Sequence, residues 1–320
     1  MLSRIAESMF WIGRYVERAE DTARILEVQT QLILEDPSIQ EDATCRSLLS
    51  IMGVAPAGEG PVDTAQIMER LAYDARSPAS IAATLAAARE SARRARETLS
   101  VPMWEALNTT YRAIPSGRFR ELRPPYTFQW VRDRAALING AADATMTRDE
   151  GWQFLILGRS IERADMTSRL VATAALSASS GSTGSPWASS LRACGAYEAF
   201  LRAYRGMETE RGAAEFLLLD RLFPRSVVYA LSRAELALDN LESASGPGGP
   251  GSTRSGFGNE AQRLLGRTRA ELEYRSLADV MTDLPAEMER LQRTCAAATD
   301  AVTRRFFAGA EALEWHGVRA

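Results

Sequence analysis

The chain has 320 residues, of which 46% are hydrophobic and 25% charged, and its formal net charge at pH 7 is −3. This balance is typical of a soluble globular protein, and the absence of a global basic field argues against nucleic acid or an anionic membrane as a partner. Charges among the first residues interrupt any signal-peptide core, and no run of about 18 apolar residues occurs. We therefore expect a cytoplasmic protein without a membrane span.

Several kinds of chemistry are excluded by the residue types. All 38 positively charged residues are Arg, which excludes Schiff-base chemistry and a P-loop Lys. The cysteines Cys45, Cys194 and Cys295 show no CxxC spacing, and His316 is the only histidine. The sequence therefore predicts no disulfide framework, no metal site and no cofactor, and disfavours a Ser-His-Asp triad. A Cys-His pair stays open, and an anion site would have to use Arg or backbone N–H groups.

Helical periodicity extends over almost the whole chain. Apolar residues recur at three- and four-residue steps, and no segment shows the sustained alternation of a strand. Predicted helices cover 3–35, 79–99, 101–114, 126–146, 149–177, 190–208, 213–221, 224–242, 258–274 and 284–313. Stretches rich in Gly, Ser and Pro are predicted as flexible loops, at 54–61, 177–188 and 243–258.

One charged phrase occurs twice. GRYVERAEDTAR at 13–24 and GRSIERADMTSR at 158–169 are identical at seven of twelve positions. On a helical wheel the charged side chains of the first copy lie away from its apolar stripe. A merely solvated face would tolerate a reshuffling of charges, so the repetition indicates that each side chain has a defined partner. The repeated charged residues are Arg14, Glu17, Arg18 and Arg24 in the first copy and Arg159, Glu162, Arg163 and Arg169 in the second.

Two kinds of partner stay open for these side chains. The two helices could cross near a pseudo-twofold axis, with Arg14 and Glu17 facing Glu162 and Arg159. Alternatively, an Arg-lined cleft between the copies could bind a carboxylate or phosphate.

Gly13 and Gly158 open the two copies. A Gly inside a helix costs about 1 kcal/mol relative to Ala, so this pair indicates a close approach of the helices. We therefore predict one all-α domain over 1–320, a helical bundle built from two pseudo-repeated halves, 1–146 and 147–320, with long Gly/Ser/Pro loops.

A second charged face follows from helical spacing in 86–104. Arg89, Arg93 and Arg96 stand at i, i+4 and i+7, and Trp104 and Asn108 follow on the next predicted helix. These residues could form a second wall of an anion site, with Trp104 as a flat platform. The alternative is a charged surface helix with Trp104 in the core.

A helical corner is predicted after Pro224, where Arg225 and Ser226 stand at a helix N-terminus. Free N–H groups there could bind an anion, or Ser226 could act as a cap. No carboxylate pair or ExxH set stands out. The catalytic candidates are Glu17 and Glu162, and the residues do not decide whether the chain is an enzyme.

Four motifs in order resemble the bacterial alpha-E family from residue 1 to about residue 313. They are MLSRIAESMFWIGRYVERAEDTAR, ARESARRARETLSVPMWEALN, WQFLILGRSIERADMTSRL and FLLLDRLFPRSVVYAL. The family is named for an all-helical fold and recurring Glu-x-Arg type motifs. Ser91 departs from the Asn expected there, and 243–258 is longer than usual. The matching charged positions are Arg14, Glu17, Arg18, Arg89, Arg93, Arg96, Glu162, Arg163 and Arg225.

The resemblance also implies partners. Genes of this family often lie beside a circularly permuted ATP-grasp ligase and a transglutaminase-like peptidase, which implies a system that makes or trims amide-linked peptides. We expect an accessory protein that binds an anionic peptide, a carboxylate ligand or the ligase through the duplicated Arg/Glu face. One alternative is an amide-bond hydrolase or transferase with Glu17 or Glu162 as general base, its pKa raised, and Arg stabilising an oxyanion. Another is a purely structural ion-pair network that joins two halves.

Overall fold

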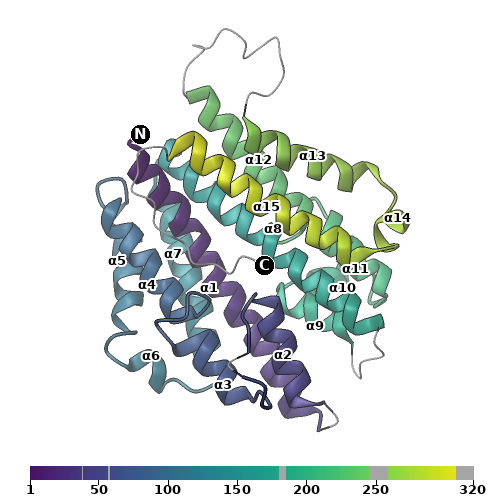
Figure 1. Ribbon diagram of the computed structural model, residues 1–320. Helices are drawn as coiled ribbons and strands as arrows, with labels where there is room; N and C mark the ends of the chain where they lie inside the picture. The colour runs from purple at the N-terminus through teal and green to yellow at the C-terminus, as the bar shows by residue number, and fades with distance from the viewer. Residues whose placement is uncertain (38, 57, 180–184, 245–258, 308–320) are drawn as a thin grey trace.

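The computed structural model describes residues 1–37, 39–56, 58–179, 185–244 and 259–307, and over these residues the protein is all-α (Figure 1). The helices of the N-terminal part are α1 (Ser3–Glu35), α2 (Glu41–Ile51), α3 (Thr64–Met68), the π-helix η1 (Glu69–Tyr73), α4 (Ile81–Arg94), α5 (Val101–Arg112), α6 (Arg118–Glu121) and α7 (Tyr126–Thr145). The remainder holds α8 (Glu150–Ser179), α9 (Pro186–Ala193), α10 (Tyr197–Ala203), α11 (Glu210–Leu219), α12 (Val227–Ala244), α13 (Glu260–Tyr274), α14 (Leu277–Met281) and α15 (Leu284–Phe306).

The long helices match the prediction, and the differences fall at short elements and breaks. Helices α3, η1, α6 and α14 are too short for periodicity to reveal, and α2 was also not predicted. The helix predicted over 190–208 is divided into α9 and α10, because Gly195 adopts a φ of 61° that ends α9. The loop predicted over 177–188 is shorter, because α8 continues to Ser179 and α9 begins at Pro186. The loop residues 180–184 and 245–258, the end of the helix predicted to 313, and His316 lie outside the described residues.

Helix α1 lies in the middle of the molecule. In Figure 1, α4, α5 and α7 lie on one side of it, and α15, α12 and α13 lie on the other. Its most extensive contact is with α8, which also packs against α12 and α15. These two helices carry the two copies of the duplicated phrase, so the arrangement places the copies against each other.

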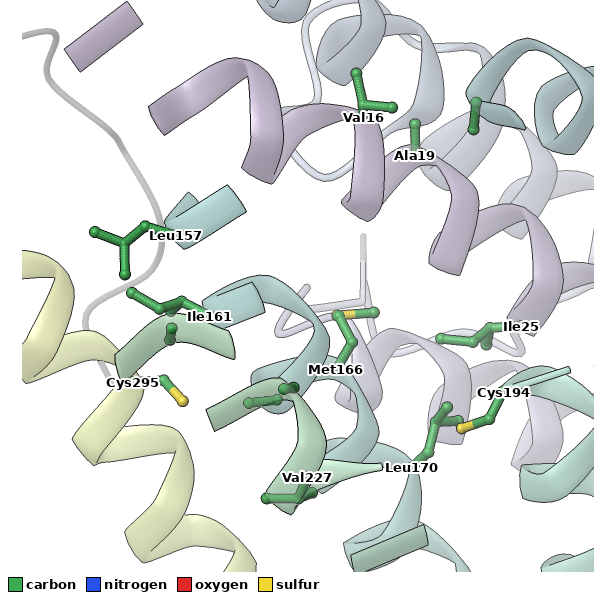
Figure 2. Packing of buried hydrophobic residues seen from close by; sticks show 14 of the residues in the cluster. Val16, Ala19, Ile25, Leu157, Ile161, Met166, Leu170, Cys194, Val227 and Cys295 are labelled. Carbon is green, nitrogen blue, oxygen red and sulfur yellow. The ribbon is translucent and has the colours of Figure 1, made fainter. Parts of the chain in front are cut away.

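The packing between these helices is a continuous apolar core. Figure 2 shows Val16 and Ala19 on α1, and Leu157 and Ile161 on α8, all of them buried members of one hydrophobic cluster. Cys295 of α15 lies in the same cluster. Burying a large aliphatic side chain stabilises the fold by roughly 1.5–3 kcal/mol, so the apolar stripes are what brings the helices together.

The charged side of α1 is also inside the molecule. Arg14, Glu17, Glu20 and Asp21 are all buried, because α8, α9 and α15 pack against α1 as well as α4 and α7. A solvated face is therefore wrong for this helix, and the charged side chains must be satisfied by protein groups.

The crossing of α1 and α8 depends on its two glycines. A Cβ atom on Gly13 would lie 2.2 Å from the carbonyl oxygen of Leu155, and one on Gly158 would lie 2.0 Å from that of Phe10. Leu155 and Phe10 each stand three residues before the glycine of their own copy. The two helices therefore touch backbone to backbone through matching positions. A repetition of the entire halves, 1–146 and 147–320, stays a prediction.

Candidate functional site

The Glu162 carboxylate on α8 is held by two arginines of α1. Arg14 donates from Nε to Oε2 at 2.7 Å. Arg18 donates from Nε to Oε1 at 2.5 Å and from Nη2 to Oε2 at 3.0 Å. The Glu162 side chain has no exposed surface, so both oxygens are neutralised inside the protein.

The Glu17 carboxylate on α1 is held in a matching way. Arg163 of α8 donates from Nε to Oε1 at 2.5 Å and from Nη2 to Oε2 at 3.1 Å. Arg225, just before α12, also lies with Nη1 2.8 Å from Oε1. Glu17, like Glu162, is fully buried.

Each copy therefore contributes an adjacent Glu and Arg, and the two dipeptides bind each other crosswise. Glu17 takes Arg163, and Glu162 takes Arg18, in forked geometries that match guanidinium to carboxylate. Such pairs contribute little net stability once desolvation is counted, but the loss of one partner leaves a buried charge. We call these four residues the crossed Glu–Arg pairs.

The predicted pairing between the copies is found only in part. Arg14 contacts Glu162 as expected, and its Nη1 also donates to Thr299 Oγ1 of α15 at 2.8 Å. Arg159, at the matching position of the second copy, does not lie within ion-pair distance of Glu17; its Nη1 lies 3.4 Å from Asn139 Oδ1 of α7.

Burial and charge oppose each other at both glutamates. Burial by itself raises the pKa of Glu162, but Arg18 and Arg14 outweigh it and lower that pKa to about 2. Burial likewise raises the pKa of Glu17, but Arg163 and Arg225 bring it below its usual value. The raised pKa expected for a general base is therefore wrong for both, because each carboxylate is saturated by guanidinium groups.

A third acidic residue, Asp21, was not singled out from the sequence. Arg225 contacts it through Nη1, and the Nη2 of Arg225 lies 2.7 Å from Glu20 Oε1. The second oxygen of Asp21 is buried without a hydrogen-bond partner. Burial, with the nearby charges of Glu17 and Glu20, raises the pKa of Asp21 to about 8 despite Arg225.

A comparison of the two copies of the phrase could have singled out Asp21 from the sequence. The matching position of the second copy is Met166, so only the first copy carries this extra carboxylate. Arg225 supplies the extra positive charge there, which accounts for its contact with the first copy.

The outer arginines of the two phrases bind within their own helices. Arg24 donates to Glu20, with Nη2 2.8 Å from Oε1. Arg169 donates from Nε to Asp165 Oδ2 at 3.0 Å and from Nη1 to the carbonyl oxygen of Ile51 at 3.1 Å. These pairs are i, i+4 contacts of the kind the spacing indicates.

The second predicted charged face is assembled at the surface of α4 and α5. The guanidinium groups of Arg89 and Arg96 lie 5.8 and 5.2 Å from the ring centre of Trp104. Arg89 also lies 5.1 Å from the ring centre of Tyr111, and its Nε is 3.5 Å from Asn108 Oδ1. Trp104 is partly exposed and also packs against the hydrophobic core, so each of the two sequence interpretations holds in part. We call Arg89, Arg96, Trp104, Asn108 and Tyr111 the Arg–Trp surface.

Arg93 belongs to the rim of this surface. It is exposed and binds Glu90 of the same helix, with Nη2 2.7 Å from Oε1. The Arg–Trp surface and the crossed Glu–Arg pairs lie on different helices, so the structure does not place all the candidate residues around one site.

Ser226 acts as a cap. Its Oγ accepts a hydrogen bond from the Tyr229 N–H at 3.2 Å and donates to the carbonyl oxygen of Asp220. The side chain thus satisfies an N–H group at the start of α12, as one of the two sequence interpretations holds.

The cysteines are buried thiols. Burial raises the pKa of Cys194 to about 12 and that of Cys45 to about 11, which leaves neither thiol reactive at neutral pH. Within the described part of the chain, no group of three or more His, Cys, Asp and Glu side chains is placed to hold a metal ion. None of the described helices is both long and apolar enough to cross a membrane.

Comparison with known proteins identifies the family. The family model named Alpha-E, described as a predicted alpha-helical domain with a conserved ER motif, matches residues 1–307. The chain belongs to the Alpha-E family. The description specifies adjacent Glu and Arg, rather than the Glu-x-Arg spacing expected, and both duplicated phrases of this Alpha-E protein carry that dipeptide, at 17–18 and 162–163.

Relatives of known sequence include an uncharacterised protein of Mycobacterium bovis and two of Mycobacterium tuberculosis. Each is 26% identical to this chain over 276 residues, which cover 77% of this chain and 31% of the relative. The chain therefore spans about a third of the length of these relatives. No solved structure matches it.

Proposed function

We propose that this Alpha-E protein is a non-catalytic accessory module of an ATP-grasp amidoligase or related peptide-modification system, and that it binds an anionic peptide or a partner protein. The observation that carries this proposal is that arginine side chains already bind the carboxylates of Glu17 and Glu162. Each is fully buried and bound by guanidinium groups, and the pKa of each is lowered. A carboxylate in that state is a poor general base, which disfavours the hydrolase or transferase alternative.

The duplicated Arg/Glu face serves a structural role in this proposal. Its arginines bind carboxylates across the contact between α1 and α8. Little of their surface is exposed: the Arg14 side chain is 10% exposed and that of Arg18 11%. A peptide could not reach them without separating the two helices. Binding therefore needs another surface.

The Arg–Trp surface is the best candidate for that contact. Arg96 is exposed and forms no ion pair with any other described residue, and it lies beside the partly exposed ring of Trp104. Trp, Tyr and Arg are the residues that most often carry the binding energy of protein interfaces. An acidic or aromatic segment of a partner could pair with Arg96 while it packs on the indole.

The length of the relatives supports an accessory role. In the mycobacterial proteins the matched stretch is 31% of a longer chain, so in those proteins this domain is covalently joined to further sequence. The ATP-grasp and transglutaminase-like partners come from the family resemblance.

A pull-down with the neighbouring ATP-grasp protein tests the proposal. The variant Arg96→Ala/Trp104→Ala should lose most of the captured partner, because truncating interface hot spots costs about 2 kcal/mol or more each. Arg202→Ala, at an exposed position of α10, is the matched control and should bind like the unchanged protein. Equal capture by both variants, with the same melting temperature, would show that the Arg–Trp surface is not the contact.

A further inference from the structure

Arg159 forms no ion pair with an acidic side chain among the described residues. In the first copy, Arg14 is neutralised by Glu162. In the second copy, the matching glutamate, Glu17, is occupied by Arg163 and by Arg225 from the start of α12. Among the described residues no Asp or Glu lies within ion-pair distance of Arg159. Because Arg225 occupies Glu17, the positive charge of Arg159 is not balanced by an ion pair.

The surroundings of Arg159 increase the cost of this charge. The side chain is only partly exposed, and its one hydrogen bond to another described residue is the 3.4 Å contact with Asn139. Burial, and then the neighbouring charges of Arg163 and Arg233, lower the pKa of Arg159, against the opposite effects of Glu17 and Asp143. A guanidinium in this situation is stabilised by any additional anion.

A cavity of about 280 Å³ lies next to this position, between α7, α8 and α12. Its α8 wall ends at Ile156, one helical turn before Arg159. Arg233 of α12 faces the cavity and, within the described chain, has no ion pair or hydrogen bond. Asn240 donates from Nδ2 to Gln153 Oε1 at 3.2 Å, so two amide groups line the same cavity.

Of the remaining charges at the cavity, all but that of Asp149 are ion-paired among the described residues. Arg148 donates from Nη2 to Asp143 Oδ1 at 2.9 Å, and its guanidinium lies 3.7 Å from the ring centre of Trp152. The adjoining hollow contains Asp149 and Glu150. Asp149 accepts the Trp152 N–H at 3.2 Å, and Glu150 binds the N-terminal amine at 2.7 Å. With the Asp149 carboxylate counted, Arg159 and Arg233 therefore leave an excess of one positive charge among the described residues around the two hollows.

We propose that this cavity binds a small oxyanion, a phosphate group or a dicarboxylate, with Arg233 in its lining and Arg159 one helical turn beyond its α8 wall. Guanidinium groups match either oxyanion in a forked geometry, and Gln153 and Asn240 can donate to its remaining oxygens. The cavity lies on other elements than the Arg–Trp surface, so its failure would leave the partner-binding proposal standing.

Calorimetric titration of the full chain at constant ionic strength tests the site, with inorganic phosphate in one arm and glutarate in the other. We expect saturable binding in at least one arm, and the arm that binds identifies the source of the oxyanion. Arg233→Gln should weaken that binding about tenfold or more, because a charge-assisted hydrogen bond is lost. Arg202→Gln should leave the affinity unchanged.

Arg159→Met separates binding from folding. Because it removes a surplus buried charge and keeps an unbranched side chain, its melting temperature without anion should equal or exceed that of the unchanged protein. The rise in melting temperature that the anion causes should be lost. Absence of saturable binding in both arms, or an affinity unaffected by both Arg233→Gln and Arg159→Met, would overturn the proposal.

Discussion

Arg18 and Glu162 stand 144 positions apart in the chain, yet the Arg18 Nε lies 2.5 Å from the Glu162 Oε1 in the interior of the protein. The same contact recurs with the copies exchanged, between Arg163 and Glu17. Together with the glycine crossing, these crossed Glu–Arg pairs fix how α1 lies on α8. Apolar stripes can slide along each other, whereas forked ion pairs are satisfied in one register.

Removal of one motif carboxylate should be strongly destabilising. Glu162→Gln leaves Arg14 and Arg18 buried without a counter-charge, and we expect the free energy of unfolding to fall by about 3–5 kcal/mol. Urea denaturation followed by circular dichroism measures this. Glu271→Gln removes a carboxylate from an exposed pair on α13 and should cost less than about 1 kcal/mol. Equal effects of the two variants would mean that the buried network does not matter.

The glycine crossing predicts opposite effects of one substitution at two sites. Gly13→Ala places a methyl group 2.2 Å from a backbone oxygen that cannot rotate away, so we expect a loss of about 3 kcal/mol or more. Gly140→Ala, within α7, meets nothing within 4 Å and should gain about 0.5–1 kcal/mol. Thermal unfolding of both variants distinguishes them. A tolerated Ala at position 13 would refute the close backbone approach.

The stability should depend on pH through Asp21. Its pKa is raised from 3.8 to about 8 on folding, so the stability linked to its proton is complete below pH 3.8 and is lost as the pH rises toward 8. Asp21→Asn removes this dependence while an oxygen remains for Arg225. The free energy of unfolding of the variant, measured by urea denaturation, should therefore rise relative to that of the unchanged protein between pH 4 and 8, by at most about 1.4 kcal/mol per pH unit.

Exposed carboxylates provide the control for this pH series. Asp133→Asn, at an exposed position of α7, should follow the unchanged protein at every pH. A constant difference between Asp21→Asn and the unchanged protein over the same range would contradict the raised pKa.

The long helices and the contact between the duplicated phrases could be predicted from the sequence, because regular apolar spacing and a repeated motif indicate them. Apolar spacing located α1 within its observed bounds, and Gly13 and Gly158 indicated the close crossing. The partner of each charge was harder to predict. Arg225 displaces Arg159 from Glu17, and this depends on where the start of α12 lies in space, which no local pattern contains. The break between α9 and α10 at Gly195 was missed for a related reason, since a single Gly inside a helical pattern does not by itself indicate a positive φ.

The most direct test of the crossed Glu–Arg pairs is a double-mutant cycle on Glu17→Gln and Arg163→Gln, measured by urea denaturation. We predict a coupling energy of about 1–3 kcal/mol, as found for contacting residues of a buried network. The same cycle on Glu271 and Arg267, an exposed i, i+4 pair, should give about 0.5 kcal/mol or less. A coupling between Glu17 and Arg163 no larger than that of the exposed pair would contradict the conclusion that the two phrases hold α1 and α8 together.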